Sequence, residues 1–587
     1  MAEPVRFRDP APLTSRRSRV ATGGNFRGEL LVAGALALVL RLIYLSGATH
    51  NPLFTHLELD PRLNDTLGWG IARGLNPEPG PFFRAPLYGY FLAGAYSIFG
   101  HNLFYPRLLQ ALMGTGTAIL LGATASRLWG RRAGTFAAVV AALYGPLIYF
   151  EGELVSVSLE VFLTAASIYF TVCAGWDRSR RPLVLAGLAL SASAVARPTV
   201  LPFALVAIAW LLSRRLPPRR VAAYAVAVAF LPLLVTSWNG LVGKDWVSAA
   251  SQGGIERPAR IASQAAAPFA RRLALTWNRR ELPGDQDQQF FAPFNSWLFR
   301  RPWLLGFWFL APIAFVTAYT ERRTAALLGG YLVCATLVAA AFFVCDRFRL
   351  PLVVAMIPLA GAGIDRFATA FGKAAMRGRG WPAATLANVA CSHGRTLVAI
   401  GLATVFVTAP FPSLQRTESG TSWFRLARAH EAAGELNLAG AAYQAAELEG
   451  MRSADFYNNW GLFEMKRRLG IHAQQHLLKA VMLDPKHGPA HENLAELYTD
   501  RDEWGLAAQE YAAAAELIPE RAAELYTNAG ALYARIDRED TAVEMYEKAL
   551  ANRPGFTPAE ERLMQLRAGT WGEAEMPKPK TWSLTPP

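Results

Sequence analysis

Acidic and basic residues gather in one short stretch near the start of a chain that is otherwise mostly apolar. Residues 56–74 read HLELDPRLNDTLGWGIARG and contain Asp60 and Asp65. The stretch lies between the first long apolar run and a second apolar block. A carboxylate in this position can accept a proton from an attacking group, which is general-base chemistry. A solvated loop with ordinary charged side chains is the alternative, and the residues alone leave both open.

Two further acidic residues stand at the start of a later apolar run. Glu153 precedes the run 154–176 and Glu160 lies inside it. Acidic residues in membrane segments are candidates for function because they are costly there. Their spacing of seven residues places them on one helix face, with Glu160 about two turns into the helix. The pair could hold an acceptor or a divalent ion.

The composition is that of a membrane protein with a soluble C-terminal part. The 587 residues are 52% hydrophobic and 18% charged, whereas soluble domains average about 25% charged residues. Residues 28–412 are largely apolar, and residues 420–570 are rich in Ala, Glu, Arg and Tyr. Much of the net charge of +14 sits in short arginine clusters between apolar runs. This pattern indicates membrane topology rather than a nucleic-acid partner, which would need one basic face.

About eleven apolar runs are candidates for helices that cross a membrane, for which about 20 residues are needed. The pair at 182–213 is short and is interrupted at Arg197-Pro198, which leaves the count open by one or two. The first run follows a basic leader but is long enough to span, so we expect a retained helix. Four cysteines without CxxC spacing indicate neither a disulfide framework nor a zinc site. The predicted spans are 29–48, 105–127, 134–150, 154–176, 182–196, 198–213, 220–238, 303–319, 325–344, 349–366 and 395–411.

The arginine clusters also predict an orientation, because positively charged loops stay in the cytoplasm. The clusters fall on one side if residues 86–99 form an amphipathic helix at the membrane surface. We therefore expect an integral protein of the bacterial inner (plasma) membrane with its N-terminus in the cytoplasm. The predicted parts are a cytoplasmic segment 1–28 and a membrane domain 29–412, with extracytoplasmic loops at 49–104 and 239–302 and a periplasmic region after 412.

The C-terminal part carries a repeat with a period of about 34 residues. Its pattern is A-x3-Y/L-x2-A, and a proline recurs at one phase, at Pro485, Pro519 and Pro554. This resembles the tetratricopeptide repeat, in which small residues let paired helices approach closely. We expect an α-solenoid over residues 420–567 and a disordered tail over 568–587. The pattern is met by Ala439/Tyr443/Ala446, Ala473/Leu477/Ala480, Ala507/Tyr511/Ala514 and Ala542/Tyr546/Ala549.

The membrane domain resembles a known enzyme family over most of residues 30–367. The stretches LDPRLNDTLGWGIARG, FFRAPLYGYFLAGAYSIFG and YPRLLQALMGTGTAILLGATASRLWG are similar to the start of GT-C glycosyltransferases of family 39 type. SAVARPTVLPFAL, WNGLVGKDWVSAASQGGI, LTWNRRELPGDQDQQFF and DRFRLPLVVAMIPLAGAGI follow in the family's order. The group includes protein O-mannosyltransferases, the lipid A aminoarabinose transferase and RgtA/B/C/D-like enzymes. The resemblance implies an all-α, polytopic GT-C domain that takes a sugar from a polyprenyl-phosphate donor.

The resemblance also assigns roles to residues. It implies that an Asp in the first outer loop is the base, for which Asp60 is the better match and Asp65 the reserve. Arg197 matches a position where relatives carry Lys or Arg facing the phosphate, and Arg84 matches a position where some carry a charged pocket residue. Arg347 and Arg349 belong to a motif before a membrane helix and could contact phosphate or anchor the helix. Residues ERPARIASQAAAPFARR, which follow SQGGI, depart from the family pattern, so sugar specificity is not implied.

Cofactors and partners follow from the same comparison. No ligand cluster of histidines is present, and a requirement for Mg²⁺ or Mn²⁺ stays open. The expected partners are a polyprenyl-phosphate-linked sugar, membrane lipid, and a protein acceptor or partner held by the repeats. No nucleic acid is expected.

Three other functions are alternatives to a glycosyltransferase. An O-antigen ligase or polymerase can carry C-terminal repeats but concentrates its functional residues in a late outer loop. A transporter would show internal repeats between its membrane halves, and none is visible here. A non-catalytic scaffold would leave the glycan unchanged after Asp60→Asn.

Overall fold

The computed structural model describes residues 24–75, 86–177, 179–242, 269–278, 287–300, 304–341, 344–377, 396, 398–408 and 419–570. Within these ranges the chain forms helices and turns without a strand, apart from one isolated bridge between Tyr144 and Leu305. The predicted all-α fold is therefore confirmed. The chain divides into two compact units, Met1–Leu414 and Gln415–Pro587.

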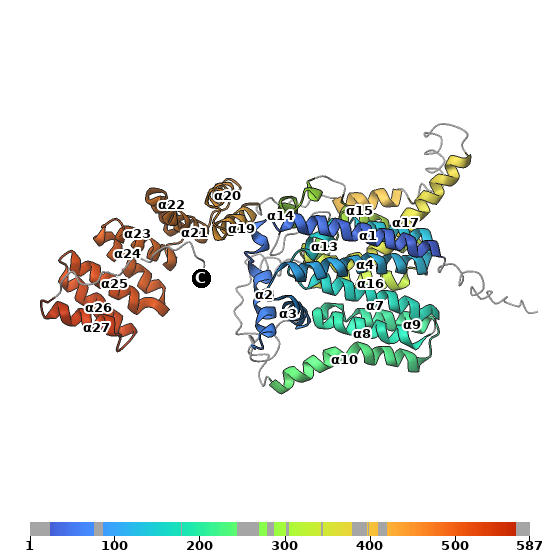
Figure 1. The fold of residues 1–587 in the computed structure, drawn as a ribbon, viewed down its shortest axis with the longest axis horizontal. Coiled ribbons are helices and arrows are strands. Elements are labelled where there is room, and N and C mark those ends of the chain that lie inside the picture. The colour runs from blue at the N-terminus through green and yellow to red at the C-terminus, as the bar shows by residue number, and fades with distance from the viewer. Residues whose placement is uncertain are drawn as a thin grey trace, which may run out of the picture. The chain divides into compact units, whose positions relative to one another are not determined.

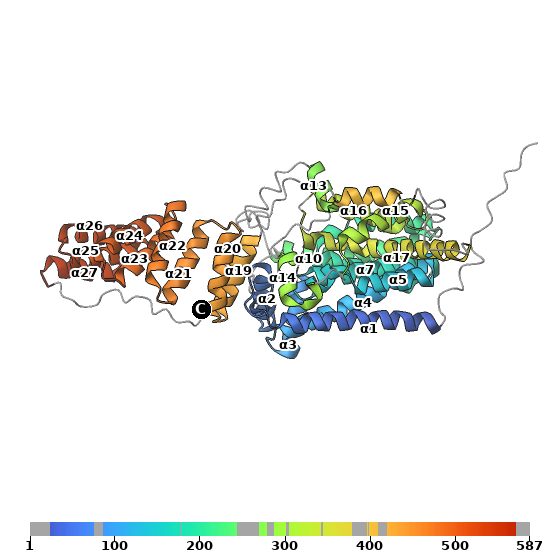
Figure 2. The same ribbon diagram turned by 90° about the horizontal axis from the view of Figure 1, so that it is seen from above.

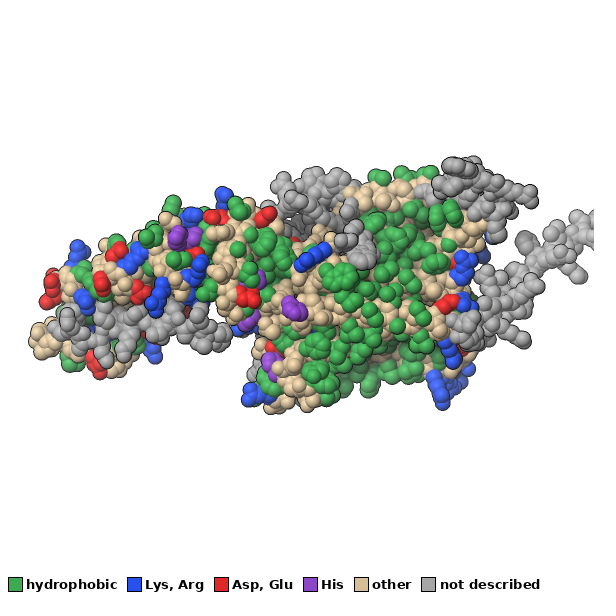
Figure 3. All heavy atoms as spheres, turned by 45° about the horizontal axis from the view of Figure 1, so that its top comes forward, with side chains coloured by type: hydrophobic (Ala, Val, Ile, Leu, Met, Phe, Trp, Pro, Cys, Tyr) green, Lys and Arg blue, Asp and Glu red, His purple; other side chains and the backbone are tan. Residues whose placement is uncertain are grey.

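The first unit is built from apolar helices that run alongside one another, with the short α2 crossing them at one end (Figure 1). Figure 3 shows the wide hydrophobic surface that these helices present. The helices are α1 (Gly24–Ala48), η1 (Pro52–Phe54), α2 (Leu59–Ala72), α3 (Leu87–Phe99), α4 (Phe104–Trp129), α5 (Arg131–Ala142), α6 (Gly145–Glu151), α7 (Val157–Asp177), α8 (Arg180–Ala196), η2 (Pro198–Val200), α9 (Phe203–Ser213), α10 (Pro218–Val242), α13 (Phe269–Trp277), α14 (Gln288–Asn295), η3 (Trp297–Phe299), α15 (Phe307–Thr320), α16 (Ala326–Ala341) and α17 (Asp346–Arg377).

Five described helices are long and apolar enough to cross a membrane, and five more are apolar but shorter. The long ones are Phe26–Ala48, Phe104–Trp129, Val157–Asp177, Pro218–Ser237 and Asp346–Lys373. The shorter ones include Pro198–Ser213, which follows the break at Arg197 that the sequence indicates. A count of about eleven spans stays a prediction.

The prediction of one span over 134–150 is wrong, because the chain breaks there into α5 and α6. Leu143 and Tyr144 leave the helix, and the Gly145 amide donates to the Leu305 carbonyl (2.9 Å). The Leu305 amide donates to the Leu143 carbonyl at the same distance. Pro146 then stands in the first turn of α6, where its missing N–H costs nothing.

Two glycines bring α2 against α3. A Cβ on Gly68 would lie 2.5 Å from the Leu92 Cβ, and one on Gly89 would lie 2.9 Å from the Leu67 Cδ2. Only glycine allows the two helices to approach so closely. The α2–α3 pair is the scaffold that carries Asp60.

The second unit stacks antiparallel helix pairs, seen from another side in Figure 2. The repeated Ala and Tyr/Leu positions lie on the second helix of each pair, and all are buried, at most 5% exposed. The tetratricopeptide prediction is therefore confirmed in its packing. The helices are α19 (Ser419–Ala432), α20 (Leu436–Leu448), α21 (Ala454–Lys466), α22 (Gly470–Leu483), α23 (Gly488–Thr499), α24 (Trp504–Leu517), η4 (Pro519–Arg521), α25 (Ala522–Arg535), α26 (Glu539–Asn552) and α27 (Thr557–Arg567).

The turn inside each helix pair repeats as well. Gly434, Arg468, Asp502 and Asp537 all have positive φ, between 59° and 77°. They are 34, 34 and 35 residues apart, which matches the period of the sequence pattern and its one added residue. In each pair, the residue in the left-handed conformation ends the first helix and lets the chain turn into the second. The tail after residue 570 lies outside the described residues.

Candidate active site

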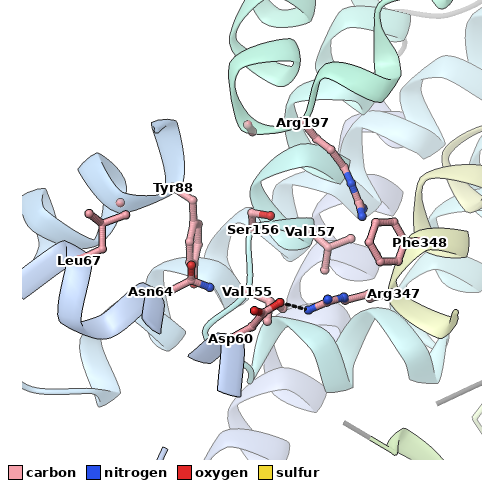
Figure 4. Close-up of a pocket in the computed structure, with 12 residues that line it drawn as sticks. Asp60, Asn64, Leu67, Tyr88, Val155, Ser156, Val157, Arg197, Arg347 and Phe348 are labelled. Carbon is pink, nitrogen blue, oxygen red and sulfur yellow. Dashed lines mark hydrogen bonds and ion pairs between the residues drawn. The ribbon is translucent and has the colours of Figure 1, made fainter. Parts of the chain in front are cut away.

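A pocket of about 270 Å³ opens in the first unit where the end of α8 and the start of α17 meet α2 and α3 (Figure 4). The turn before α7 forms another part of its wall. The lining residues are Asp60, Asn64, Leu67, Tyr88, Gly89, Val155, Ser156, Val157, Ala196, Arg197, Arg347 and Phe348. Segments far apart in the sequence therefore meet here.

Asp60 and Arg347 form an ion pair inside the pocket. The Arg347 Nη1 donates to the Asp60 Oδ2 at 2.6 Å, and Figure 4 shows the two side chains pointing toward each other. The Asp60 side chain is 31% exposed and that of Arg347 is 17% exposed. Both stand in the first turns of their helices. The Asp60 carboxylate can thus be reached from the pocket and carries a cation at hydrogen-bond distance.

The backbone before Asp60 is unusual. Leu59 has a φ of +50°, a left-handed conformation that costs a residue with a side chain about 1–2 kcal/mol. Glu58 before it is extended, so the chain turns sharply into α2. Strained residues of this kind often stand beside functional groups. Here the turn places Asp60 at the start of the helix, where the helix dipole favours a carboxylate.

A second ion pair lies behind the first. The Arg197 Nη1 donates to the Glu160 Oε2 at 3.1 Å, and the Glu160 side chain is only 1% exposed. The Arg197 guanidinium also lies over the Phe348 ring at 3.7 Å, and that of Arg347 lies 5.2 Å from the same ring. Two guanidinium groups and two carboxylates therefore stand around one aromatic ring.

The predicted pairing of Glu153 with Glu160 on one helix face is wrong. α7 begins at Val157, so Glu153 lies in the turn before it and Glu160 lies in the first helical turn. The helix begins later than the apolar run because the chain from Glu151 to Ser156 turns. Glu160 reaches the site through Arg197, and Glu153 is absent from the pocket lining.

Asp65 faces away from the pocket. Five residues along an α-helix turn the side chain by about 140°, and Asp65 accordingly points toward Tyr96 and His101 at the C-terminal end of α3. The Tyr96 hydroxyl donates to its Oδ1 at 2.5 Å, and the His101 Nε2 lies 3.0 Å away. The His101 ring stacks on Trp69 at 4.7 Å. This arrangement ties α2 to the end of α3.

Of the two remaining predicted arginines, Arg349 is absent from the described pocket lining. The Arg349 Nη2 donates to the Asn278 carbonyl at 2.5 Å, its guanidinium lies 4.0 Å from the Phe307 ring, and the residue is 3% exposed. Its position favours anchoring of the helix over contact with a ligand. Arg84 lies outside the described residues.

Sequence reasoning did not single out most of the lining, including Asn64, Tyr88 and Phe348. Asn64 lies one turn after Asp60 and donates to the Leu154 carbonyl at 2.9 Å, which joins α2 to the turn before α7. The Tyr88 hydroxyl donates to Gln110 at 2.7 Å, and the Phe348 ring lies against both arginine guanidinium groups. The i, i+4 spacing from Asp60 could have identified Asn64. For Tyr88 and Phe348 the sequence offers no comparable signal.

A buried polar network holds the turn that lines the pocket. The Gln110 Nε2 donates to the carbonyls of Glu151 and Glu153, both at 2.7 Å. The Arg107 Nε donates to the Gly152 carbonyl at 2.8 Å, and Arg41 pairs with the Glu151 carboxylate at 2.5 Å. Because each polar group here has a partner, the network fixes the turn in one position. Among the described residues, no group of three or more His, Cys, Asp or Glu is placed to hold a metal ion.

Two family profiles match the sequence. Residues 83–238 match the family described as dolichyl-phosphate-mannose-protein mannosyltransferase, and residues 523–556 match the tetratricopeptide repeat. The first match contains Tyr88, Glu160 and Arg197, whereas Asp60 and Arg347 lie on either side of it. No curated protein sequence matches the chain.

Several solved structures resemble parts of the chain. The structure titled ArnT from Cupriavidus metallidurans bound to undecaprenyl phosphate is 15% identical, with 86% of this chain and 80% of that one covered and a TM-score of 0.41. The oligosaccharyltransferase AglB from Archaeoglobus fulgidus, in complex with an inhibitory peptide and a dolichol-phosphate, is 14% identical. That match covers 68% of this chain and 58% of AglB, with a TM-score of 0.36. The MamA protein is 24% identical over 26% of this chain and 82% of MamA, with a TM-score of 0.24.

All three TM-scores are below 0.5, so these likenesses carry no argument about function. Residues 83–238 are similar to the dolichyl-phosphate-mannose-protein mannosyltransferases, and residues 523–556 are similar to the tetratricopeptide repeat.

Proposed function

We propose that the first unit transfers a hexosyl or pentosyl group from a polyprenyl-phosphate donor to an extracytoplasmic acceptor, and that the pocket around Asp60 is the reaction site. One observation carries the proposal. A carboxylate that can be reached from the pocket stands among two guanidinium groups, at the edge of a membrane domain of this family. A base and cations for a phosphate are the groups that such a transfer needs.

The reaction assigns a task to each side chain. The acceptor oxygen attacks C1 of the sugar while its proton passes to the Asp60 carboxylate. The bond between C1 and the phosphate oxygen breaks, and its electron pair stays on that oxygen. The leaving lipid phosphate thereby gains negative charge, which Arg347 and Arg197 stabilise through charge-assisted hydrogen bonds. Glu160 holds Arg197 in position and does not touch the reacting atoms.

The second unit is proposed to recruit a protein acceptor or an assembly partner. Stacked tetratricopeptide repeats present an extended surface to peptides, and the family described for residues 83–238 acts on proteins. A Mg²⁺ or Mn²⁺ requirement is a separate matter, tested by transfer after treatment with a chelator and after each metal is added back.

The test is mass spectrometry of envelope glycans in a strain that lacks the protein and in strains that carry its variants. We expect Asp60→Asn to lower transfer by about 10²–10⁴-fold, since it removes the general base. Asp65→Asn is the matched control: it makes the same chemical change on the same helix but faces Tyr96 and His101. Full restoration of the glycan by Asp60→Asn would contradict the proposal.

A further inference from the structure

The ion pair between Asp60 and Arg347 occupies two groups that the proposed reaction needs free. The Asp60 carboxylate must accept a proton, yet it accepts a hydrogen bond from the Arg347 guanidinium at 2.6 Å. A carboxylate beside a guanidinium is a weaker base than an unpaired one. Arg347 must bind phosphate, yet one of its donors already has a carboxylate. The structure therefore describes a resting arrangement of the site.

Resting on the proposed function, we infer that the donor phosphate displaces Asp60 from Arg347, so that binding of the lipid donor produces the free base. The phosphate takes the Arg347 guanidinium, and the Asp60 carboxylate turns into the pocket toward the acceptor. The base is then active only when a donor is in place. This order protects the donor, because the acceptor is not activated in its absence.

The carboxylates of the two ion pairs differ in exposure to solvent, and this difference decides which pair opens. Glu160 is 1% exposed, and separating it from Arg197 would leave a buried charge without its cation. The Asp60 side chain is 31% exposed, so solvent in the pocket can hydrate its carboxylate as it leaves. An entering anion therefore exchanges with Asp60 and leaves the Arg197–Glu160 pair intact.

Phe348 keeps Arg347 at the pocket during the exchange. The Arg347 guanidinium lies 5.2 Å from the ring centroid, which attracts a cation whichever anion it binds. The matching contact of Arg197 at 3.7 Å holds the other side of the site. The phosphate consequently meets two cations in place and exchanges with the Asp60 carboxylate.

The same pair accounts for release of the product. Transfer moves the acceptor proton to Asp60 and leaves the lipid phosphate bound to Arg347. When Asp60 gives its proton to solvent, its carboxylate competes again for the guanidinium. Re-formation of the pair expels the lipid phosphate and restores the resting site.

The experiment measures binding of undecaprenyl phosphate to the full chain in lipid nanodiscs. We expect Asp60→Asn and Asp60→Ala to bind about fivefold more tightly than the natural chain, because one partly exposed ion pair no longer competes. Asp177→Asn is the control, because it removes the carboxylate of a remote ion pair with Arg127, whose closest atoms are 3.2 Å apart; its affinity should stay that of the natural chain.

The deciding measurement repeats Asp60→Asn in an Arg347→Met background. If displacement from Arg347 is the cause, Arg347→Met weakens binding and the gain from Asp60→Asn disappears in the double variant. Equal or weaker binding by both Asp60 variants, or a gain that persists without Arg347, overturns the inference and leaves the transfer results untouched. The proposed function itself is overturned separately, by full restoration of the glycan with Asp60→Asn.

Discussion

Arg197 belongs to an ion pair whose other member is nearly inaccessible, which governs how its variants behave. Glu160 is 1% exposed and contacts Arg197 at 3.1 Å. Removal of one member of a buried ion pair costs about 3–5 kcal/mol, because the remaining charge loses its partner. Loss of transfer in an Arg197 variant can thus come from unfolding as well as from lost phosphate contact.

We expect Arg197→Ala to lower the free energy of unfolding by about 3–5 kcal/mol. The double variant Glu160→Gln/Arg197→Met should recover most of that loss, because no charge is left buried, while transfer stays low. Thermal unfolding in detergent and glycan analysis of the same variants check the two results. Arg347→Met is the comparison, with a loss of about 1 kcal/mol or less for a partly exposed pair. Equal stability of Arg197→Ala and the natural chain would contradict this account.

At the residue scale the sequence could name candidates but could not arrange them. The resemblance to GT-C glycosyltransferases indicates Asp60, Arg197 and Arg347, and the structure brings all three to one pocket. Their roles there stay predictions. The direction of Asp65 depends on how α2 is rotated against α3, which no local pattern specifies. Glu153 was placed on a helix because the apolar run gives no sign of the turn before Val157.

Helix α2 is positioned by its close contact with α3. The pocket therefore depends on Gly68 and Leu92, which are not among its lining residues. A methyl group on Gly68 would meet the Leu92 Cβ at 2.5 Å, and one helix would have to move. Asp60 stands two turns before Gly68 on the same helix. A shift of α2 therefore carries the carboxylate away from Arg347.

We expect Gly68→Ala to lower the free energy of unfolding by about 1–3 kcal/mol, as overpacking does, and to reduce transfer as well. Gly94→Ala in α3 is the matched control, because a Cβ at Gly94 meets nothing within 4 Å. Its stability should stay equal or rise by up to about 1 kcal/mol from better helix propensity. Thermal unfolding and glycan analysis check both. Similar effects of the two substitutions would show that close packing does not position α2.

Within the second unit, the pair α21 and α22 buries a histidine between aromatic rings. The His476 ring stacks on that of Trp460 at 3.9 Å and is 8% exposed as a residue. Burial, followed by the charge of Lys479, lowers the pKa of His476 from 6.5 to about 4, against a smaller opposing effect of Glu447. His476 in the folded unit therefore binds a proton only at a lower pH than it does in the unfolded chain.

The lowered pKa of His476 makes the folded unit less stable in acid. The contribution of His476 to stability is complete above about pH 6.5 and is lost as the pH falls toward 4. In the fragment 415–587, His476→Phe should make the fall in melting temperature between pH 7 and pH 5 smaller. His491 acts in the opposite direction, since its hydrogen bond with Glu510 raises its pKa, so the variant must be compared with the natural fragment. The exposed His472→Gln is the control, and an unchanged slope for His476→Phe would contradict the prediction.

Element boundaries were predictable where the sequence carries a period or a cap. The repeats were found because a 34-residue spacing of small residues is visible without any structure, and the buried faces of α20, α22, α24 and α26 follow it. The break between α5 and α6 was missed because apolar residues continue through it. Gly145-Pro146 was the available signal, since proline is common in the first turn of a helix. The partner of that break, Leu305, is too distant in sequence to be inferred.

At the scale of the whole molecule, two units with separate cores share one chain. The first presents apolar helices suited to a bilayer, and the second packs a solenoid around small residues. The proposed acceptor chemistry requires the pocket and the repeats to face the same side of the membrane. The arginine clusters predict that this side is the periplasm.

Cysteine labelling tests that orientation directly. Residues 419–570 contain no cysteine, and Leu448 is 88% exposed, so Leu448→Cys in a cysteine-free background gives one reactive thiol on the second unit. A membrane-impermeant maleimide should label it in intact spheroplasts. Ser213→Cys, in the exposed end of α9 beside a cluster of arginines, should react only after lysis. The opposite pattern would place the repeats in the cytoplasm, away from any periplasmic acceptor, and would reverse the predicted topology.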